Sequence, residues 1–311
     1  ASDVYKRQEW TGVTDIMIDP RDSNILYAAT WDRHRTVAAL MGGGPGTAIY
    51  RSDDGGETWK ILKNGLPNNP DSNDDGVIDQ DDLPSSNMGK IGLAISPQNP
   101  DVVYAAIELD RTKGAVYRSD DRGETWKKMS DTVSGGTGPH YYQELYASPH
   151  KFDRLYLMNV RVLTSEDGGK TFERITENKK HVDSHDILFD PNDPDYIMIS
   201  CDGGIYESFD RMDTWRFIDN LPIIQLYRVG IDNQKPFYNV YGGTQDNDSF
   251  GGPSRTKNRS GIRNSDWFVT TGGDGFQVRV DPTDPNILYT MSQLSLIHIS
   301  EPTRQAEISY A

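Results

Sequence analysis

Segments of alternating apolar and polar residues recur six times along the chain. Each forms a strand, a turn and a second strand, and the segments start at Ile16, Leu93, Leu145, Ile187, Val229 and Val278. Runs of Val, Ile, Tyr and Leu with a period of two, broken by Asp-Pro or Asn-Pro turns, are typical of paired antiparallel strands. The pattern therefore predicts an all-β chain built from repeated hairpins.

An eight-residue box follows four of these six segments. Its copies read SDDGGETW, SDDRGETW, SEDGGKTF and SFDRMDTW, and they span Ser52–Trp59, Ser119–Trp126, Ser165–Phe172 and Ser208–Trp215. The copies start 67, 46 and 43 residues apart. A repeat of roughly 40 to 45 residues with this content is typical of a four-stranded propeller blade. We therefore expect an incomplete β-propeller of about five blades and the start of a sixth.

The Asp at the third position of each box is expected to be structural. A residue that recurs once per blade stabilises the blade and is not expected to be catalytic. Its carboxylate can accept hydrogen bonds from backbone N–H groups of its own turn. The fifth position is Gly, which adopts a positive φ freely, except that Met212 stands there in the fourth copy and predicts a strained or different turn. The closing Trp or Phe is expected to pack between blades. The four carboxylates are Asp54, Asp121, Asp167 and Asp210.

These boxes match the Asp-box, or bacterial neuraminidase, repeat. Three longer runs resemble the sortilin-like branch of such propellers, whose bacterial members are often labelled glycosyl hydrolases: KHVDSHDILFDPNDPD, ESFDRMDTWRFIDNLPI and residues 237–276. The resemblance covers most of residues 10–293. It implies a secreted or periplasmic propeller that binds a peptide or a glycan, and it does not by itself imply catalysis.

The charge of the chain narrows the classes of partner. Among 311 residues, 32 Lys and Arg stand against 47 Asp and Glu, a net charge of −15. Such a surface repels phosphate backbones and anionic lipid headgroups, so neither nucleic acid nor a membrane surface is an expected partner. No apolar run approaches the roughly 20 residues needed to cross a bilayer. The single cysteine, Cys201, excludes an internal disulfide.

The two ends of the chain differ in texture from the interior. Residues 1–8, ASDVYKRQ, and residues 294–311, LSLIHISEPTRQAEISYA, resemble translated sequencing adapters. We expect both to be artefacts that do not belong to the fold. The propeller is then assigned to residues 9–293, and the chain is expected to be a metagenomic fragment of a longer protein.

An acidic insertion at residues 71–82, DSNDDGVIDQDD, has the spacing of an EF-hand-type calcium loop. Such loops place oxygen ligands at positions 1, 3, 5, 9 and 12, a backbone carbonyl at 7 and Gly at 6. Pro84 disfavours a helix after the loop, so a complete helix–loop–helix unit is not expected. We expect a structural calcium ion, the alternative being a solvated acidic loop. The ligands would be Asp71, Asn73, Asp75, the carbonyl of Val77, Asp79 and Asp82.

The inner strands of the blades predict a ligand site, because in a propeller they line the central channel. Four residues before the turn of each unit stand Asp15, Gly92, Glu144, Asp186, Arg228 and Gln277. Seven residues before it stand Gly12, Gly89, Tyr141, Asp183, Gln225 and Asp274. A ring of acids, amides and aromatics suits a polar ligand, although these groups could instead bond to one another and to trapped water. The predicted ligand-binding residues are His140, Tyr141, Tyr142, Glu144, His181, Asp183, His185, Asp186, Arg228, Gln245, Asp246, Asp274 and Gln277.

Two shorter clusters are open to two interpretations each. In an extended strand, His181, Asp183 and His185 would share one face and could hold a metal ion or form an acid–base pair, the alternative being a hydrogen-bonded turn. The basic run at residues 33–35, Arg-His-Arg, could contact an anion or form a solvated turn. For the histidine cluster the turn is favoured, because the cluster lacks a third fixed ligand, and for the basic run neither interpretation is preferred.

The main functional prediction is a sortilin-like propeller that binds a peptide or glycan without catalysis. The alternative is a glycoside hydrolase, which needs two carboxylates about 5 to 10 Å apart across a sugar ring. Sialidase activity is disfavoured, because the Phe/Tyr-Arg-Ile-Pro motif that accompanies it does not occur. A structural or assembly protein is a third interpretation. The sequence selects no pair among the candidate carboxylates Asp15, Glu144, Asp183, Asp186, Asp246 and Asp274.

Overall fold

The computed structural model describes residues 10–67, 88–109, 113–134, 141–221 and 223–293, and the backbone of 296–300. The chain forms two compact units, Ala1–Ile218 and Asp219–Ala311. The described residues of both units are almost entirely β-structure, with one short 3₁₀ helix, Asn264–Asp266. No helix among the described residues is long and apolar enough to span a membrane.

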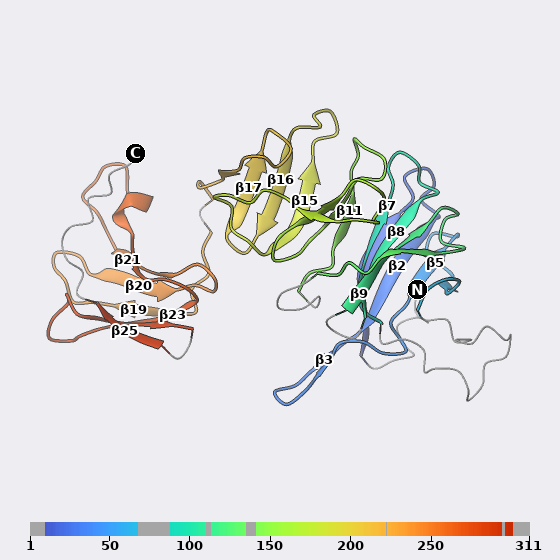
Figure 1. Ribbon diagram of the computed structural model, residues 1–311. Helices are drawn as coiled ribbons and strands as arrows, with labels where there is room; N and C mark the ends of the chain where they lie inside the picture. Colours follow the sequence, from blue (N-terminus) through green and yellow to red (C-terminus); the bar gives the residue numbers. More distant parts are fainter. Residues whose placement is uncertain are drawn as a thin grey trace. The chain divides into compact units, whose positions relative to one another are not determined.

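Unit 1 consists of four antiparallel sheets of four strands, each of them a propeller blade (Figure 1). Blade 1 contains β1 (Thr11–Ile18), β2 (Leu26–Asp32), β5 (Ile49–Ser52) and β6 (Lys60–Leu62). Blade 2 contains β7 (Met88–Ile95), β8 (Val103–Leu109), β9 (Lys113–Ser119) and β10 (Lys127–Ser130). Strands that are neighbours in the sequence of each blade also pair in its sheet, as expected for meandering hairpins.

Blades 3 and 4 repeat this arrangement with shorter strands. Blade 3 contains β11 (Leu145–Ala147), β12 (Leu155–Leu157), β13 (Leu163–Ser165) and β14 (Glu173–Arg174). Blade 4 contains β15 (Ser184–Phe189), β16 (Ile197–Cys201), β17 (Gly204–Ser208) and β18 (Arg216–Phe217). An extra hairpin, β3 (His34–Arg35) and β4 (Leu40–Met41), lies between the second and third strands of blade 1 and projects from the sheets in Figure 1.

Apolar side chains hold neighbouring blades together, because alternate residues of one strand reach opposite blades. In β8, Val103 packs in the cluster shared with blade 1, and Tyr104 packs in the cluster shared with blade 3. A third cluster joins blades 3 and 4 through side chains such as Tyr156 and Ile199. Blade 2 therefore has two buried faces, and this explains the nearly continuous apolar run of β8.

The Asp boxes form the turns between the third and fourth strands of these blades. In the first copy, Asp54 accepts hydrogen bonds from the Thr58 backbone N–H at 2.9 Å and from the Thr58 hydroxyl at 2.6 Å. These bonds lower the pKa of Asp54 to about 2. The Ser52 hydroxyl accepts a hydrogen bond from the backbone N–H of Gly56, whose φ is +92°. The same bonds recur at Asp121, Asp167 and Asp210.

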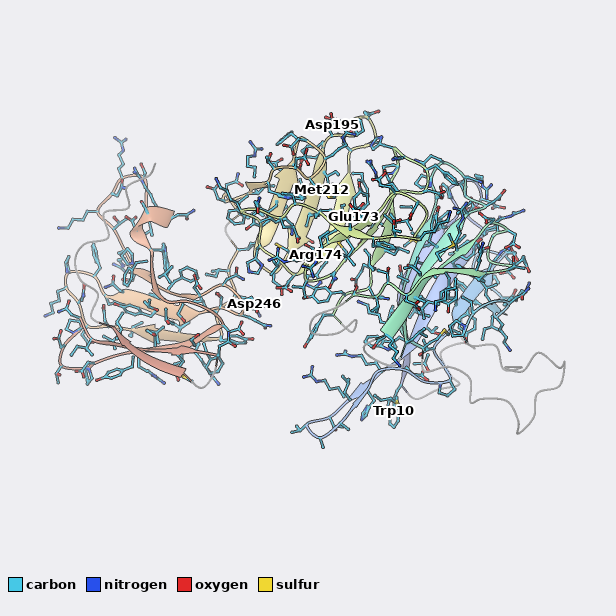
Figure 2. All side chains as sticks on the ribbon, viewed as in Figure 1. Trp10, Glu173, Arg174, Asp195, Met212 and Asp246 are labelled. Atoms are coloured by element: carbon cyan, nitrogen blue, oxygen red, sulfur yellow. The ribbon has the colours of Figure 1, made fainter. Side chains whose placement is uncertain are left out.

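Met212 occupies the glycine position of the fourth box without changing the turn (Figure 2). Its φ is +76°, close to the values of the three glycines, and its backbone N–H donates to Ser208 Oγ at 2.8 Å. A side chain at positive φ is strained. The thioether is 2% exposed in the cluster between blades 3 and 4. Burial of this side chain offsets the strain. The fourth box thus has the strained turn that the sequence predicted.

Unit 2 contains one four-stranded and one three-stranded antiparallel sheet. The first has β19 (Arg228–Ile231), β20 (Asn239–Gly243), β21 (Ser249–Pro253) and β22 (Phe268–Thr271), and the second has β23 (Gly275–Val280), β24 (Leu288–Ser292) and β25 (Leu296–Ser300). Tyr241, Val278 and Leu288 form their shared core.

The predicted fold class, five four-stranded blades and the start of a sixth, is confirmed. Strand β25 lies in the C-terminal segment that was expected to be outside the fold, and its backbone pairs with β24. Residues 1–9 and 301–311 lie outside the described residues.

Candidate functional site

Asp15 lies on the innermost strand of blade 1 and bridges to blade 2. Its Oδ2 accepts a hydrogen bond from the backbone N–H of Leu93 in β7 at 2.8 Å. Burial raises the pKa of the Asp15 carboxyl above its usual range, and the negative charge of Glu144 raises it further, while the N–H of Leu93 and the charge of Lys90 act against them. The protonated form of Asp15 is therefore more favoured in the folded chain than it would be in water.

Glu144 precedes the innermost strand of blade 3 and forms an ion pair with Lys90 of blade 2. The Lys90 ammonium donates to Glu144 Oε1, and the two side chains are 13% and 31% exposed. Glu144 Oε2 is buried and has no hydrogen-bond partner among the described residues. One oxygen of this carboxylate is therefore paired with a cation, and the other is buried without a hydrogen-bond partner in the part of the chain that the structure describes.

The backbone before Glu144 approaches blade 2 very closely. The carbonyl oxygen of Gln143 lies 1.8 Å from the point where a Cβ of residue 92 would stand, so only Gly fits there. Gln143 itself has a φ of +101° and is fully buried. Strained, buried residues of this kind persist where the surrounding structure fixes them, often beside a functional site.

Asp186 of blade 4 continues the row of acids. Its Oδ1 accepts a hydrogen bond from the Tyr146 hydroxyl of blade 3 at 2.8 Å. Burial, and then the hydrogen bond to Asp186, raise the pKa of Tyr146, so Tyr146 remains a protonated donor. The charges of Glu144 and Asp15 also act on Tyr146, so the three acids share one neighbourhood. We call Asp15, Lys90, Glu144, Tyr146 and Asp186 the acid cluster.

A second set of predicted residues lies at the ends of the same inner strands. The Tyr142 hydroxyl donates to Asp183, and the Tyr142 ring stacks on His185 with centroids 5.4 Å apart and planes 13° apart. His185 Nε2 lies 2.8 Å from Asp202 Oδ1. Tyr141 is 47% exposed beside this stack. The predicted residue His140 lies outside the described residues.

His181, Asp183 and His185 do not share one face of a strand, and the chain forms a turn here, the alternative given in the sequence analysis. Strand β15 begins only at Ser184, and Asp183 has a φ of +61°, so the backbone turns between the two histidines. His181 Nδ1 lies 2.9 Å from the carbonyl oxygen of Val182 instead. Among the described residues, no group of three metal-ligating side chains occurs. The calcium-type loop at residues 71–82 lies outside them.

The remaining predicted residues belong to unit 2. The backbone N–H of Asp246, which is labelled in Figure 2, donates to Asp274 Oδ1 at 2.6 Å. The Tyr227 hydroxyl donates to Gln245 Oε1 at 2.6 Å. Arg228 and Gln277 help to line a cavity of about 630 Å³, together with Leu226, Tyr227, Val229, Phe276 and Arg279. This volume lies within the range of small-molecule sites. Unit 2 therefore contains a separate polar site, without carboxylates in its lining.

The sequence analysis missed three residues that complete these sites, namely Lys90, Tyr146 and Asp202. Lys90 lies on the inner strand of blade 2 and Tyr146 on that of blade 3, at positions that the register comparison did not include. A survey of every polar residue on these strands would have found both. Asp202 follows the second strand of blade 4 and had no signal in the register of the first strands.

A family model described as "Sortilin, neurotensin receptor 3" (Sortilin-Vps10) matches residues 114–270, half of the chain. The chain belongs to this family. The BNR/Asp-box repeat also matches, at residues 50–60. The predicted resemblance to sortilin-like Asp-box propellers is thereby confirmed.

Curated relatives of this Sortilin-Vps10 chain are named xyloglucanases. It is 25% identical over 224 residues to the oligoxyloglucan-reducing end-specific xyloglucanase of Emericella nidulans, which covers 68% of this chain and 24% of that protein. Xyloglucanase Xgh74A of Acetivibrio thermocellus is 26% identical over 238 residues, covering 69% and 26%. The chain thus spans about a quarter of these relatives. It is a propeller related to glycoside hydrolases, which favours the hydrolase alternative over the non-catalytic main prediction.

Solved structures similar to this Sortilin-Vps10 chain include two enzymes. The GH74 enzyme of Niastella koreensis has a TM-score of 0.46 and 17% identity, over 91% of this chain and 41% of that one. The GH74 xyloglucanase of Xanthomonas campestris has a TM-score of 0.45 and 19% identity, over 89% and 41%.

Proposed function

We propose that this protein is a glycoside hydrolase that acts on a polysaccharide through the acid cluster of unit 1. The curated relatives are named xyloglucanases, so a xyloglucan-type glycan is the proposed substrate. The proposal extends from relatives of which the chain spans about a quarter. The glycoside hydrolase, which was the alternative prediction, thereby becomes the first hypothesis. Asp15 and Glu144 are the two carboxylates selected for it.

The observation that carries the proposal is the contrast between two neighbouring carboxyl groups. Burial raises the pKa of Asp15, whereas Lys90 neutralises the charge of Glu144. Glycosidases need one carboxyl that keeps a proton for the leaving oxygen and one ionised carboxylate on the other side of the sugar. Asp15 is assigned as the general acid, and Glu144 as the base or nucleophile.

The other members of the acid cluster position these two groups. Lys90 is a positioning residue, because it holds Glu144 in place and balances its charge. The Tyr146 hydroxyl already donates its proton to Asp186, so the Tyr146 oxygen and the Asp186 carboxylate would accept hydrogen bonds from sugar hydroxyls. The N–H groups of Leu93 and Ile16 both donate to the Asp15 carboxyl, and the bond from Leu93 at Oδ2 fixes its orientation.

Release of reducing sugar from xyloglucan by the full chain tests this proposal. Asp15→Asn and Glu144→Gln should each lower kcat by about 10²-fold to 10⁴-fold, the range typical of a lost acid or base. Glu57→Gln, an exposed acid in the first Asp box, is the matched control and should retain activity. Unchanged rates in both cluster variants, with thermal stability preserved, would contradict the assignment of these residues.

A non-catalytic binding propeller is the second candidate function, and one observation favours it. Asp15 already bonds the backbone of the next blade, which is what a structural carboxylate does. A wild-type chain that binds a glycan or peptide but releases no sugar would support this function and reject the first. The two outcomes are separated by measuring calorimetric binding and sugar release on the same preparation.

We further propose that the protein acts outside the cytoplasm, because an intact polysaccharide does not cross a membrane. This agrees with the secreted or periplasmic location that the family resemblance implied. Expression of the complete gene followed by cell fractionation tests it. Recovery of the protein from the cytosol alone would contradict the proposal.

A further inference from the structure

Blade 1 differs from the other blades of unit 1 by a projecting hairpin. In the other three, only a few residues separate the second and third strands: residues 110–112 in blade 2, 158–162 in blade 3 and 202–203 in blade 4. In blade 1, residues 33–48 are inserted at this point and contain β3 and β4, which we call the arm (Figure 1). The arm joins neighbouring strands of one sheet, so the blade does not need it to close its hydrogen bonds.

The base of the arm is fixed to blade 1 by buried polar contacts. Asp32 is 3% exposed and accepts hydrogen bonds from the Thr11 hydroxyl and from the backbone N–H of Gly46 at 2.7 Å. Trp31 Nε1 donates to the carbonyl oxygen of Gly42 at 3.0 Å. A Cβ at Gly44 would lie 2.6 Å from Asp32 Oδ2, so a larger residue there would displace the Asp32 carboxylate. These contacts hold both ends of the arm in one place.

An exposed aromatic platform lies where the arm leaves the blade. The rings of Trp10 and His34 stack with centroids 4.4 Å apart and planes 24° apart, and Trp10 is 46% exposed. The backbone N–H of Arg33 donates to the Trp10 carbonyl at 3.1 Å, which ties the platform to the arm. Trp10 is labelled beside the arm in Figure 2. An indole that is supported by a second ring is a flat apolar surface with little conformational freedom to lose.

The indole of the platform lies at the start of the strand that contains the proposed general acid. Trp10 directly precedes β1, and Asp15 follows five residues later on that strand. At about 3.3 Å per residue, the two positions are roughly 16 Å apart along β1. This separation exceeds one sugar ring, so a chain held at both points would reach the platform several units away from the cleaved bond.

We infer that the Trp10–His34 platform is a stacking subsite for a sugar ring of the polysaccharide, remote from the acid cluster. Pyranose rings have an apolar C–H face and a polar edge, which suits a flat aromatic surface surrounded by solvent. A single exposed indole is far smaller than a stable protein–protein interface. This inference rests on the proposed function, since it takes its ligand from there.

A length series of uncleaved xyloglucan oligosaccharides tests the subsite by calorimetry on the full chain. Trp10→Ala should weaken binding of long oligosaccharides about tenfold, or ~1.4 kcal/mol, and leave short ones unchanged. His34→Ala should weaken binding of the long ones less, because the indole remains. Val37→Ala, at the exposed tip of the arm, is the matched control and should bind every length like the wild type.

Three results separate this inference from the proposed function. Equal affinities of Trp10→Ala and wild type at every length would overturn the subsite, even if the acid cluster cleaves xyloglucan. A similar loss for short and long oligosaccharides would also overturn it, since that pattern indicates a damaged fold. A loss confined to long oligosaccharides, in a chain that releases no sugar, would support the subsite while rejecting hydrolysis.

Discussion

At the scale of single residues, the carboxylates of unit 1 have two distinct kinds of environment. The Asp-box carboxylates accept several hydrogen bonds and are exposed, so their charged form is favoured. Asp15 is half-buried near another acid, and the loss of solvation raises its pKa, so its protonated form is more favoured than in water. Burial and hydrogen bonding shift a carboxyl pKa in opposite directions. The same residue type therefore fixes a turn in one place and is suited to carry a proton in another.

The Asp boxes predict how stability depends on acid pH. The pKa of Asp54 is about 2 in the folded chain and near 3.8 in the unfolded chain, so its contribution is complete above pH 4 and is lost as pH falls towards 2. Asp54→Asn should therefore show a shallower fall in melting temperature between pH 4 and pH 2 than the wild type. Glu57→Gln removes an adjacent charge and should keep the wild-type slope. Equal slopes for Asp54→Asn and wild type would contradict the argument.

At the scale of elements, the blades are held by apolar faces that interlock with their neighbours. Side chains of β8 reach clusters on both faces of blade 2. In β1, by contrast, Ile16 and Ile18 are 55% and 57% exposed, although the equivalent residues of β7 are packed against blade 1. Burial of each inner strand thus depends on the blade beside it rather than on its own sequence.

A matched pair of valines tests this dependence. Val103 is fully buried between blades 1 and 2, and Val37 is fully exposed in the arm. Val103→Ala should lower the free energy of unfolding by about 2 kcal/mol, because two methyl groups and their packing are lost. Val37→Ala should change it by less than about 0.5 kcal/mol. Denaturant unfolding measures both, and similar effects of the two substitutions would contradict the proposed packing.

The acidic loop at residues 71–82 remains a proposed calcium site. If it binds calcium, the ion stabilises the folded chain in proportion to its occupancy. Calorimetric titration with calcium should show binding to the wild type and a loss of that heat in Asp71→Ala, whereas Asp22→Ala, an exposed acid elsewhere, should behave like the wild type. Identical traces for Asp71→Ala and wild type would reject the site.

The blades were predictable from the sequence because their signals are local. A box of eight residues contains the hydroxyl, the carboxylate and the glycine that make its turn, so Ser52, Asp54 and Gly56 could be interpreted together. The alternation of apolar residues likewise identifies each strand without knowledge of its neighbours. The turn at Asp183 was anticipated as the alternative to an extended strand, but its exact position was not, because nothing in HVDSHD distinguishes a left-handed Asp from one in a strand.

At the scale of the whole molecule, the contacts that define the candidate site join distant parts of the chain. Asp15 and Leu93 are 78 residues apart, and Lys90 and Glu144 are 54 apart. The register of the repeats placed the acids on equivalent strands, but it could not show which neighbour each one meets. The division of the chain after Ile218 also had no sequence signal, since the alternating pattern continues through it.

The glycine at position 92 limits how this site can be redesigned. Because a carbonyl oxygen of the adjoining blade fills the volume of its missing methyl group, residue 92 accepts no substitution unless two blades separate. Blade 2 therefore cannot supply an acid where blades 1, 3 and 4 do. Substitutions that alter the chemistry of unit 1 are therefore restricted to Asp15, Glu144, Asp186 and Lys90. The same restriction applies to natural selection on this sequence.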